Sequence, residues 1–324
     1  MNEIEFEAAH EGAWRALASA LAKRGADAVI PAREVPRRFR SLVSQLALAR
    51  DRQYRTSLID RLHALVLEAH LAVHAARAER RYRSARALWQ WIAADFPVHV
   101  RAQKPFVLAA ALAFFGPFLG VIAAVEWFPD FVYYLVSPET LAKVQSMYAP
   151  GNERFGAGRE AESDMMMFGF YIANNVRIDL QCLAGGILFG LGSLAALVGN
   201  GVFLGAVAGH LTEVGYGENF WGFVAGHSAF ELIGLVLAGA AGLRIGYALV
   251  APGRHPRTAA LSAAGRDAAM LLSGAALLTI GAAFIEAFWS SRVSIPFVVK
   301  VAFGAILGVV TVAYLVLGGR SRGR

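Results

Sequence analysis

The stretch Phe220–Val250 reads FWGFVAGHSAFELIGLVLAGAAGLRIGYALV and is apolar over most of its length. About 20 apolar residues suffice for a helix to cross the hydrocarbon core of a bilayer, so this stretch predicts a membrane helix that tilts or projects beyond the bilayer. His227 and Glu231 lie in its first third, four residues apart, and therefore share one face of the helix. Ionisable side chains inside a membrane segment mark a candidate functional site, so this pair is the first one to explain.

The composition is typical of a multi-pass membrane protein with a soluble part, because 56% of the 324 residues are apolar. The net charge of +7 does not indicate nucleic-acid binding, since residues 1–104 carry 18 Lys or Arg against 11 Asp or Glu and alone account for the excess. Basic residues before a first span mark the cytoplasmic side of the membrane. The sequence therefore predicts the lipid bilayer as a partner and excludes nucleic acid. Its single cysteine, Cys182, excludes an intrachain disulfide.

Residues 1–104 predict a soluble, cytoplasmic domain of amphipathic helices. Apolar residues recur there at helical spacing, as in Trp14, Leu17 and Leu21. About three to five such helices can bury their apolar stripes against one another or lay them on the membrane surface. The basic stretch from Arg77 to Arg86 is typical of a solvated or headgroup-facing surface, and a docking site for an acidic partner is the alternative.

Residues 105–324 predict about six membrane segments, so the fold class is an all-α polytopic membrane bundle with the N-terminal helical domain attached. Acidic residues, proline and glycine gather in an extracytoplasmic loop at about residues 129–171, whereas the loop at 251–265 and the tail are basic and cytoplasmic. Both termini are then cytoplasmic. The third segment is short or re-entrant, and Gly199-Asn200-Gly201 before it reads as a turn. The six segments are expected at about residues 105–128, 172–198, 202–211, 220–250, 267–289 and 296–317.

Polar side chains in these segments gather toward the outer leaflet, which predicts one outward-facing polar site. Asn174 and Asn175 are expected to open the second segment and to cap it, because asparagine is a preferred N-cap residue. Lys300 is expected to snorkel to the headgroups rather than to act as a counter-ion of the site. The expected members of the site are His227, Glu231, Glu286, Asn174, Asn175, Arg177 and His210.

The spacing of His227 and Glu231 is compatible with several roles. The two can form a hydrogen-bonded pair that fixes helix packing, or can hold a divalent metal ion with Glu286 as a third ligand. They can also act as general acid and base on a substrate from outside, or line a translocation path. The zinc-protease motif His-Glu-x-x-His is not present, because residue 228 is serine and residue 231 is glutamate.

Small residues recur every four positions along several segments, which predicts close packing of the membrane helices. A bundle packed in this way leaves little room for a continuous wet path, so a transporter or channel is the least favoured function. The repeats are Gly201, Gly205 and Gly209; Gly222 and Gly226; Gly234, Ala238, Gly242 and Gly246; and Gly304 and Gly308.

Seven short motifs follow one another along the chain: Glu11-x-x-Trp14-x-x-Leu17, Phe39-Arg40-x-Leu42, Ala69-His70-x-x-Val73-His74, Asn174-Asn175-x-Arg177, Asn200-Gly201-x-x-x-Gly205, His227-x-x-x-Glu231-Leu232 and Ile285-Glu286. This succession resembles the stage II sporulation protein M (SpoIIM) family over most of the chain. The family usually has His-Gly-x-x-Glu-Leu in the fourth segment, where this chain has Ser228, and a common glycine after Glu286 is replaced by Ala287. Both are exchanges between small residues, so the packing that the resemblance implies survives.

The resemblance implies an integral membrane protein that, in sporulating bacteria, assembles peptidoglycan-degrading proteins at the septal membrane. We therefore expect a multi-pass scaffold of the bacterial inner (cytoplasmic) membrane, linked to cell-envelope remodelling, rather than an enzyme. Its expected partners are proteins bound by residues 1–104 or by the outer loop, and a second copy of the chain. The alternative is a membrane-embedded metal-dependent enzyme that uses His227, Glu231 and Glu286 with a divalent metal as its cofactor.

Overall fold

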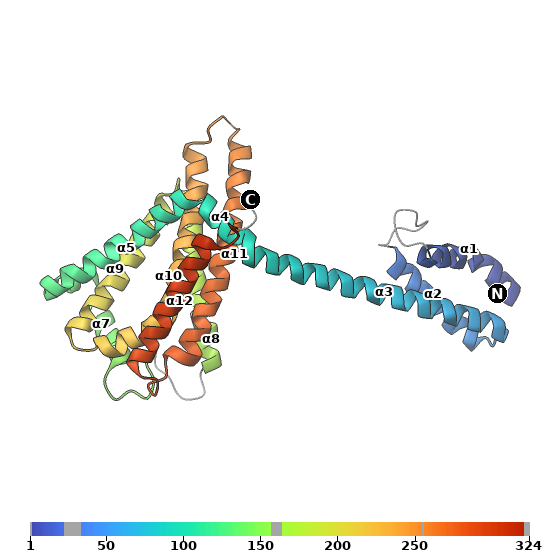
Figure 1. Cartoon of the computed structure of the whole chain (residues 1–324), viewed down its shortest axis with the longest axis horizontal. Coiled ribbons are helices and arrows are strands. Elements are labelled where there is room, and N and C mark those ends of the chain that lie inside the picture. Colours follow the sequence, from blue (N-terminus) through green and yellow to red (C-terminus); the bar gives the residue numbers. More distant parts are fainter. Residues whose placement is uncertain (1, 23–33, 157–163, 255, 321–324) are drawn as a thin grey trace. The chain divides into compact units, whose positions relative to one another are not determined.

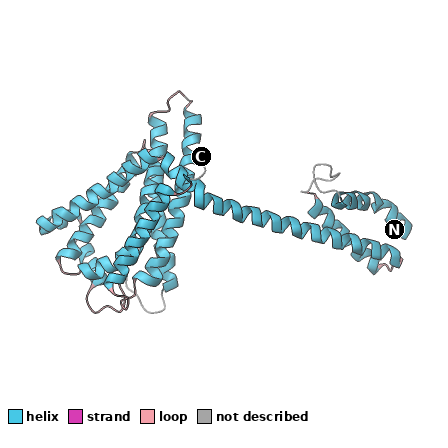
Figure 2. Ribbon diagram, in the orientation of Figure 1, coloured by secondary structure: helices cyan, strands magenta, loops and turns pink. Residues whose placement is uncertain are grey.

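The computed structural model describes residues 2–22, 34–156, 164–254 and 256–320, and every regular element in these ranges is a helix (Figure 2). The all-α fold class is thereby confirmed. The chain divides into two compact units, residues 1–90 and residues 91–324. The sequence places this boundary at residue 104, before the first apolar segment. Residues 91–104 belong to the second unit because Trp91 and Phe96 pack against its helices, where Trp91 Nε1 lies 3.4 Å from Met270 Sδ.

The N-terminal unit consists of three described helices, α1 (Glu3–Ala22), α2 (Val35–Asp51) and α3 (Thr56–Gln90) (Figure 1). Their apolar stripes face one another, and Trp14 Nε1 donates a hydrogen bond to Gln45 Oε1 at 2.8 Å within this core. The side chains of residues 72–84 lie outside the described part, so most of the basic stretch Arg77–Arg86 is described only as helical backbone. The core side chains are Phe6, Trp14, Leu17, Leu42, Leu46, Ala49, Leu58, Leu62, Leu65 and Ala69.

In the described part of the second unit, five helices are long and apolar enough to cross a bilayer: α5, α9, α10, α11 continued by η4, and α12. The chain is therefore a multi-pass membrane protein. The elements are η1 (Trp91–Asp95), α4 (Phe96–Ala102), α5 (Lys104–Trp127), η2 (Pro129–Phe131), α6 (Val132–Leu135), α7 (Pro138–Tyr148), α8 (Asp164–Ala184), η3 (Gly185–Ile187), α9 (Leu191–Glu213), α10 (Gly217–Val250), α11 (Arg257–Ile285), η4 (Glu286–Ser290) and α12 (Phe297–Leu317).

Helix α10 is the centre of this bundle, with α11, α12, α9, α8 and α5 packed around it, and α5 runs beside α9 (Figure 1). Small residues make the close approaches, as the sequence predicts. A Cβ on Gly242 of α10 would lie 2.3 Å from the Cys182 carbonyl oxygen of α8, and one on Gly304 of α12 would lie 1.8 Å from the Ala225 carbonyl oxygen. At these positions only glycine lets the backbones touch.

The predicted limits of the second, third and fifth segments are wrong. The fifth begins at Arg257 and not at residue 267, so residues 257–265 are helix and not loop. Gly199-Asn200-Gly201 is not a turn but lies inside the continuous helix α9. Gly201 serves helix packing instead, because a Cβ there would lie 2.4 Å from the Phe114 carbonyl oxygen of α5. The real break falls at residues 185–190, where Phe189 and Gly190 adopt the left-handed conformation with φ of 56° and 85°.

Helix α8 is a sixth helix of the bundle, although it is not among the five apolar candidates. It carries Asn174, Asn175, Arg177 and Asp179, which lower its hydropathy. In its first half, Phe168 packs against Phe288 of η4, with the ring centres 5.9 Å apart. After its last residue, the backbone of Gly186 approaches α10 so closely that a Cβ would lie 2.3 Å from the Gly242 carbonyl oxygen. Gly242 lies fifteen residues beyond His227 on α10, or about 22 Å along the helix axis. α8 therefore runs along most of the depth of the bundle.

Candidate functional site

Three helices meet at one level of the bundle and set the register of the site. The Thr279 hydroxyl of α11 donates a hydrogen bond to the Asp179 carboxylate of α8 at 2.7 Å, and a Cβ on Gly234 of α10 would lie 2.9 Å from Thr279 Oγ1. Helices α10 and α11 are antiparallel neighbours. A step of seven residues back along α10 from Gly234 and a step of seven residues forward along α11 from Thr279 therefore reach the same level, about 10 Å away. These steps reach His227 and Glu286.

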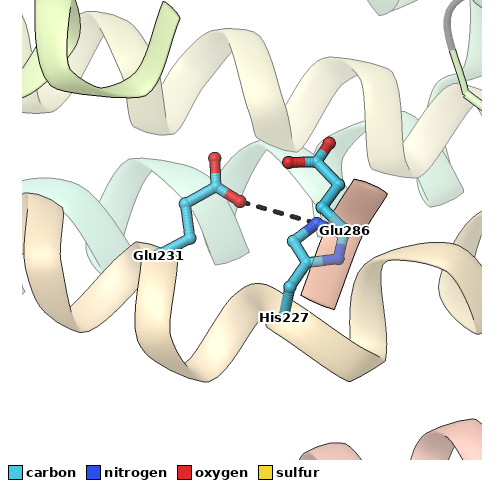
Figure 3. A group of neighbouring side chains, drawn as sticks. All are labelled: His227, Glu231 and Glu286. Carbon is cyan, nitrogen blue, oxygen red and sulfur yellow. Dashed lines mark ion pairs between the residues drawn. The ribbon is translucent and has the colours of Figure 1, made fainter. Parts of the chain in front are cut away.

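The structure brings His227, Glu231 and Glu286 together, from two separate elements (Figure 3). One ligand atom from each lies within 4.8 Å of the other two. His227 Nε2 and Glu231 Oε2 are 3.5 Å apart, and the two side chains rise from successive turns of α10. His227 is buried, with a side chain 4% exposed, and Glu286 is buried, whereas the Glu231 side chain remains 30% exposed.

The other ring nitrogen of His227 is held by Ser290, whose hydroxyl oxygen lies 3.0 Å from Nδ1. Glu286 and Ser290 are the first and last residues of η4, a π-helical turn that ends α11. Such turns occur frequently at functional sites, because the extra residue re-aims the side chains that follow it. Nε2 of the imidazole is thereby the nitrogen that faces the carboxyl groups.

Lys300 does not snorkel to the headgroups, contrary to the sequence-based prediction. It is 2% exposed, and its Nζ donates a hydrogen bond to the Ser290 carbonyl oxygen at 2.8 Å. The ammonium also lies 5.5 Å from the centre of the Phe155 ring. Lys300 thus lies inside the bundle, against the same η4 turn that supplies Glu286 and Ser290.

Asn174 and Asn175 do not cap the second segment, because α8 begins ten residues earlier at Asp164. Asn175 is buried, at 6% exposure, on the same face of α8 as Asp179, four residues away. Asn174 Nδ2 donates to Asn175 Oδ1 at 3.0 Å, while Asn175 Nδ2 has no hydrogen-bond partner among the described residues. Asn175 is therefore a buried amide with one donor group to spare, one turn away from the Asp179–Thr279 level.

Arg177 and His210 make their contacts elsewhere. Arg177 is exposed on α8, and its guanidinium lies 3.4 Å from Asn174 Oδ1. His210 is buried on α9, with Nε2 2.8 Å from Gln145 Nε2 of α7 and its ring beside Tyr133 of α6. These contacts tie His210 to the helices α6 and α7 rather than to α10.

Two residues near the cluster lie outside the sequence-based prediction. Ser290 follows Glu286 by four residues, the same spacing that singles out His227 and Glu231, so this signal was present in the sequence. Tyr148 ends α7, and burial raises the pKa of its hydroxyl, with the charges of Glu286, Tyr171 and Glu231 raising it further. The Tyr148 hydroxyl therefore lies within electrostatic reach of the cluster, which its place in a loop of the sequence does not indicate.

Comparison with protein families gives two matches. The model of the family described as stage II sporulation protein M matches residues 108–291, more than half of the chain, and this range contains His227, Glu231, Glu286 and Ser290. The model of a domain of unknown function, DUF8413, matches residues 4–75 in the N-terminal unit. Neither the curated proteins nor the solved structures contain a match to this chain.

Proposed function

Because the chain belongs to the stage II sporulation protein M family, we propose that it is an integral membrane scaffold that recruits protein partners through its N-terminal helical unit. In this proposal the second unit anchors the chain in the bacterial inner membrane with both termini in the cytoplasm. The basic residues of the N-terminal region, the loop at 251–256 and the tail support that orientation. The resemblance to the family supports a role beside proteins that remodel the cell envelope.

One feature of α3 carries the proposal. The helix extends from Thr56 to Gln90, but its last buried residue among the side chains described is Ala69. Beyond it, Leu71, Leu88 and Trp89 are 62%, 57% and 70% exposed. A helix gains most of its stability in proteins from packing an apolar face, so an extension of this length with exposed apolar side chains is suited to pack against another protein.

The packing of the three-helix core also supports the proposal, because it holds the beginning of α3 in place. Leu58, Leu62 and Leu65 of α3 are buried against α1 and α2, and Arg61 of α3 pairs with Glu11 of α1 at 2.7 Å. The beginning of α3 is therefore held by its own unit. The end of α3 presents its apolar side chains from a helix whose start is already fixed.

Photo-crosslinking tests the proposal in cells of the native host. A photoreactive amino acid replaces Leu71 or Trp89 in the full chain, and the matched control replaces Leu62, which faces the core of the unit. We expect a discrete protein adduct from the exposed positions and none from Leu62. Glu substituted at Leu71 should abolish the adduct formed from Trp89. Adducts with lipid alone, or adducts that Leu71→Glu leaves unchanged, contradict a protein-docking surface on α3.

A second candidate function is a metal-dependent activity inside the membrane, and the convergence of His227, Glu231 and Glu286 favours it. Three protein ligands leave at least one position on a metal ion for water or substrate, as in catalytic zinc sites. This candidate differs from the scaffold in one measurable respect. It requires that Glu231→Gln abolish the cellular function while the α3 adducts persist, whereas a scaffold tolerates this change if the fold is preserved.

A further inference from the structure

We propose that His227, Glu231 and Glu286 bind one divalent transition-metal ion of the zinc class, between the α10 helix and the η4 turn. The ligand atoms would be Nε2 of His227 and one carboxylate oxygen from each glutamate. This site lies on α10 and η4 and shares no residue with the exposed end of α3. The metal proposal and the scaffold proposal are therefore tested by different measurements.

The distance between His227 and Glu231 is longer than in a tight hydrogen-bonded ion pair. An imidazole that donates to a carboxylate in a buried ion pair approaches to about 2.7–2.9 Å. Nε2 and Oε2 are instead 3.5 Å apart. Two ligands on one tetrahedral zinc ion, with bonds of about 2.0–2.1 Å, are separated by about 3.4 Å. The observed spacing is therefore compatible with two atoms that share an ion, and Glu286 offers its ligand atom within 4.8 Å of both.

The hydrogen bond to Ser290 points to the same arrangement. A histidine that ligates a metal through one nitrogen usually donates its other N–H to an oxygen nearby, which fixes the ring and the tautomer. Ser290 Oγ lies 3.0 Å from Nδ1 and is placed to accept that hydrogen. In that tautomer Nε2 carries a lone pair directed at Glu231, and the contact is favourable when a cation or a carboxylic-acid proton lies between them.

The charges in the cluster also favour a doubly charged ion. Glu231 and Glu286 each place a carboxylate oxygen within 4.8 Å of a His227 ring nitrogen, in a part of the bundle where His227 and Glu286 are almost fully buried. Buried carboxylates are costly unless they are paired or ligate a metal. A dication can balance both carboxylates beside the Lys300 ammonium, which donates a hydrogen bond to the Ser290 carbonyl oxygen of the same η4 turn.

The ligand set indicates which ions fit. One imidazole nitrogen with two carboxylate oxygens suits zinc and similar first-row ions, while calcium and magnesium prefer ligand shells made only of oxygen. Three protein ligands leave a position for water.

Metal analysis of the purified full chain in lipid nanodiscs tests the site. The protein is stripped with a chelator, incubated with Zn²⁺ and desalted, and its zinc content is measured by mass spectrometry. We expect about one ion per chain, falling at least about tenfold in Glu231→Gln and His227→Ala because each removes one ligand. The matched control is His210→Asn, which removes a buried histidine on α9 outside the cluster, and it should retain the full zinc content.

A spectroscopic measurement on the unsubstituted chain keeps the test independent of how well the variants fold. Cobalt(II) added to the stripped protein should produce visible absorption bands that saturate at about one equivalent and disappear when Zn²⁺ displaces the cobalt, as expected for a zinc-type site. The proposal is overturned if neither Zn²⁺ nor Co²⁺ binds to the unsubstituted chain. Equal metal content in Glu231→Gln, His227→Ala and the unsubstituted chain would overturn it as well.

Discussion

Gly304 and Gly308 are equivalent members of the small-residue repeat in the sequence, but in the structure they differ in how much space a side chain would have. A Cβ on Gly304 would lie 1.8 Å from the Ala225 carbonyl oxygen of α10, whereas a Cβ on Gly308 would lie 3.6 Å from Ala229 Cβ, at ordinary contact distance. We therefore expect Gly304→Ala to destabilise the folded bundle by about 1–3 kcal/mol, the usual cost of overpacking, or more if α12 shifts. Gly308→Ala should change stability little. Thermal unfolding of both variants in the same detergent checks this, and equal midpoints would contradict the packing of α12 on α10.

The core of the candidate site could be predicted from the sequence, but its surroundings could not. Helical periodicity alone places His227 and Glu231 on one face, and a shared depth in the bundle brings Glu286 to them. The prediction for Lys300 is wrong because hydropathy does not distinguish a lysine that reaches the headgroups from one that reaches a backbone carbonyl inside the bundle. The positions of Asn174 and Asn175 depended on where α8 begins, and the α8 boundary was wrong.

At the scale of the elements, α1 and α3 are joined by ion pairs that should respond to acid. Hydrogen bonding to Arg61 lowers the pKa of Glu11 in the folded unit. A carboxyl group whose pKa is lower in the folded state stabilises the fold above its unfolded pKa, and that contribution is lost as the pH falls through the lower, folded value. We therefore expect the stability of the N-terminal unit to decrease as the pH falls below about 4.3, the ordinary pKa of a glutamate.

Trp14 provides the probe for this prediction. In a chain that retains Trp14 and carries phenylalanine at its other tryptophans, the fluorescence of Trp14 reports thermal unfolding of the N-terminal unit, whose core contains this ring. The midpoint should fall with acid in the unsubstituted Glu11 background and fall less in Glu11→Gln, which has no charge to lose. Identical pH profiles for the two chains would show that the Glu11–Arg61 pair contributes nothing to this interface.

The membrane helices differ in how well the sequence predicts them. The first, fourth and sixth segments, at about 105–128, 220–250 and 296–317, match α5, α10 and α12 to within a few residues, because long apolar runs bounded by proline or polar residues are unambiguous. The predictions for the second and third segments are wrong because glycine pairs favour turns in most sequences. In a membrane bundle a glycine inside a helix often serves close packing, and Gly201 does so against α5.

At the scale of the whole molecule, the two units are stabilised by different interactions. The N-terminal unit has a core of its own, made by side chains from α1, α2 and α3. The membrane unit is held by backbone contacts at glycines, since lipid provides no hydrophobic driving force between helices. A change in one unit should therefore leave the other folded, which allows the α3 surface and the His227 site to be tested in the same full chain.

The number of crossings is the property of the whole molecule that most depends on α8. Between Glu139 in α7 and Arg254 after α10 lie α8, α9 and α10. If all three cross the membrane, the two positions face opposite sides. If α8 does not cross, only two crossings separate them and they face the same side. The packing of α8 from the level of η4 to that of Gly242 favours three crossings.

Cysteine labelling decides between these topologies. In a Cys182→Ala background, which removes the chain's single cysteine, Glu139→Cys and Arg254→Cys each introduce one thiol at an exposed position. We expect a membrane-impermeant maleimide to label Glu139→Cys in intact cells and to label Arg254→Cys only after permeabilisation, because the basic residues near Arg254 favour the cytoplasm. Labelling of both positions in intact cells would mean that α8 returns to the side from which it enters. The depth of the bundle at which His227 lies would then have to be reassigned.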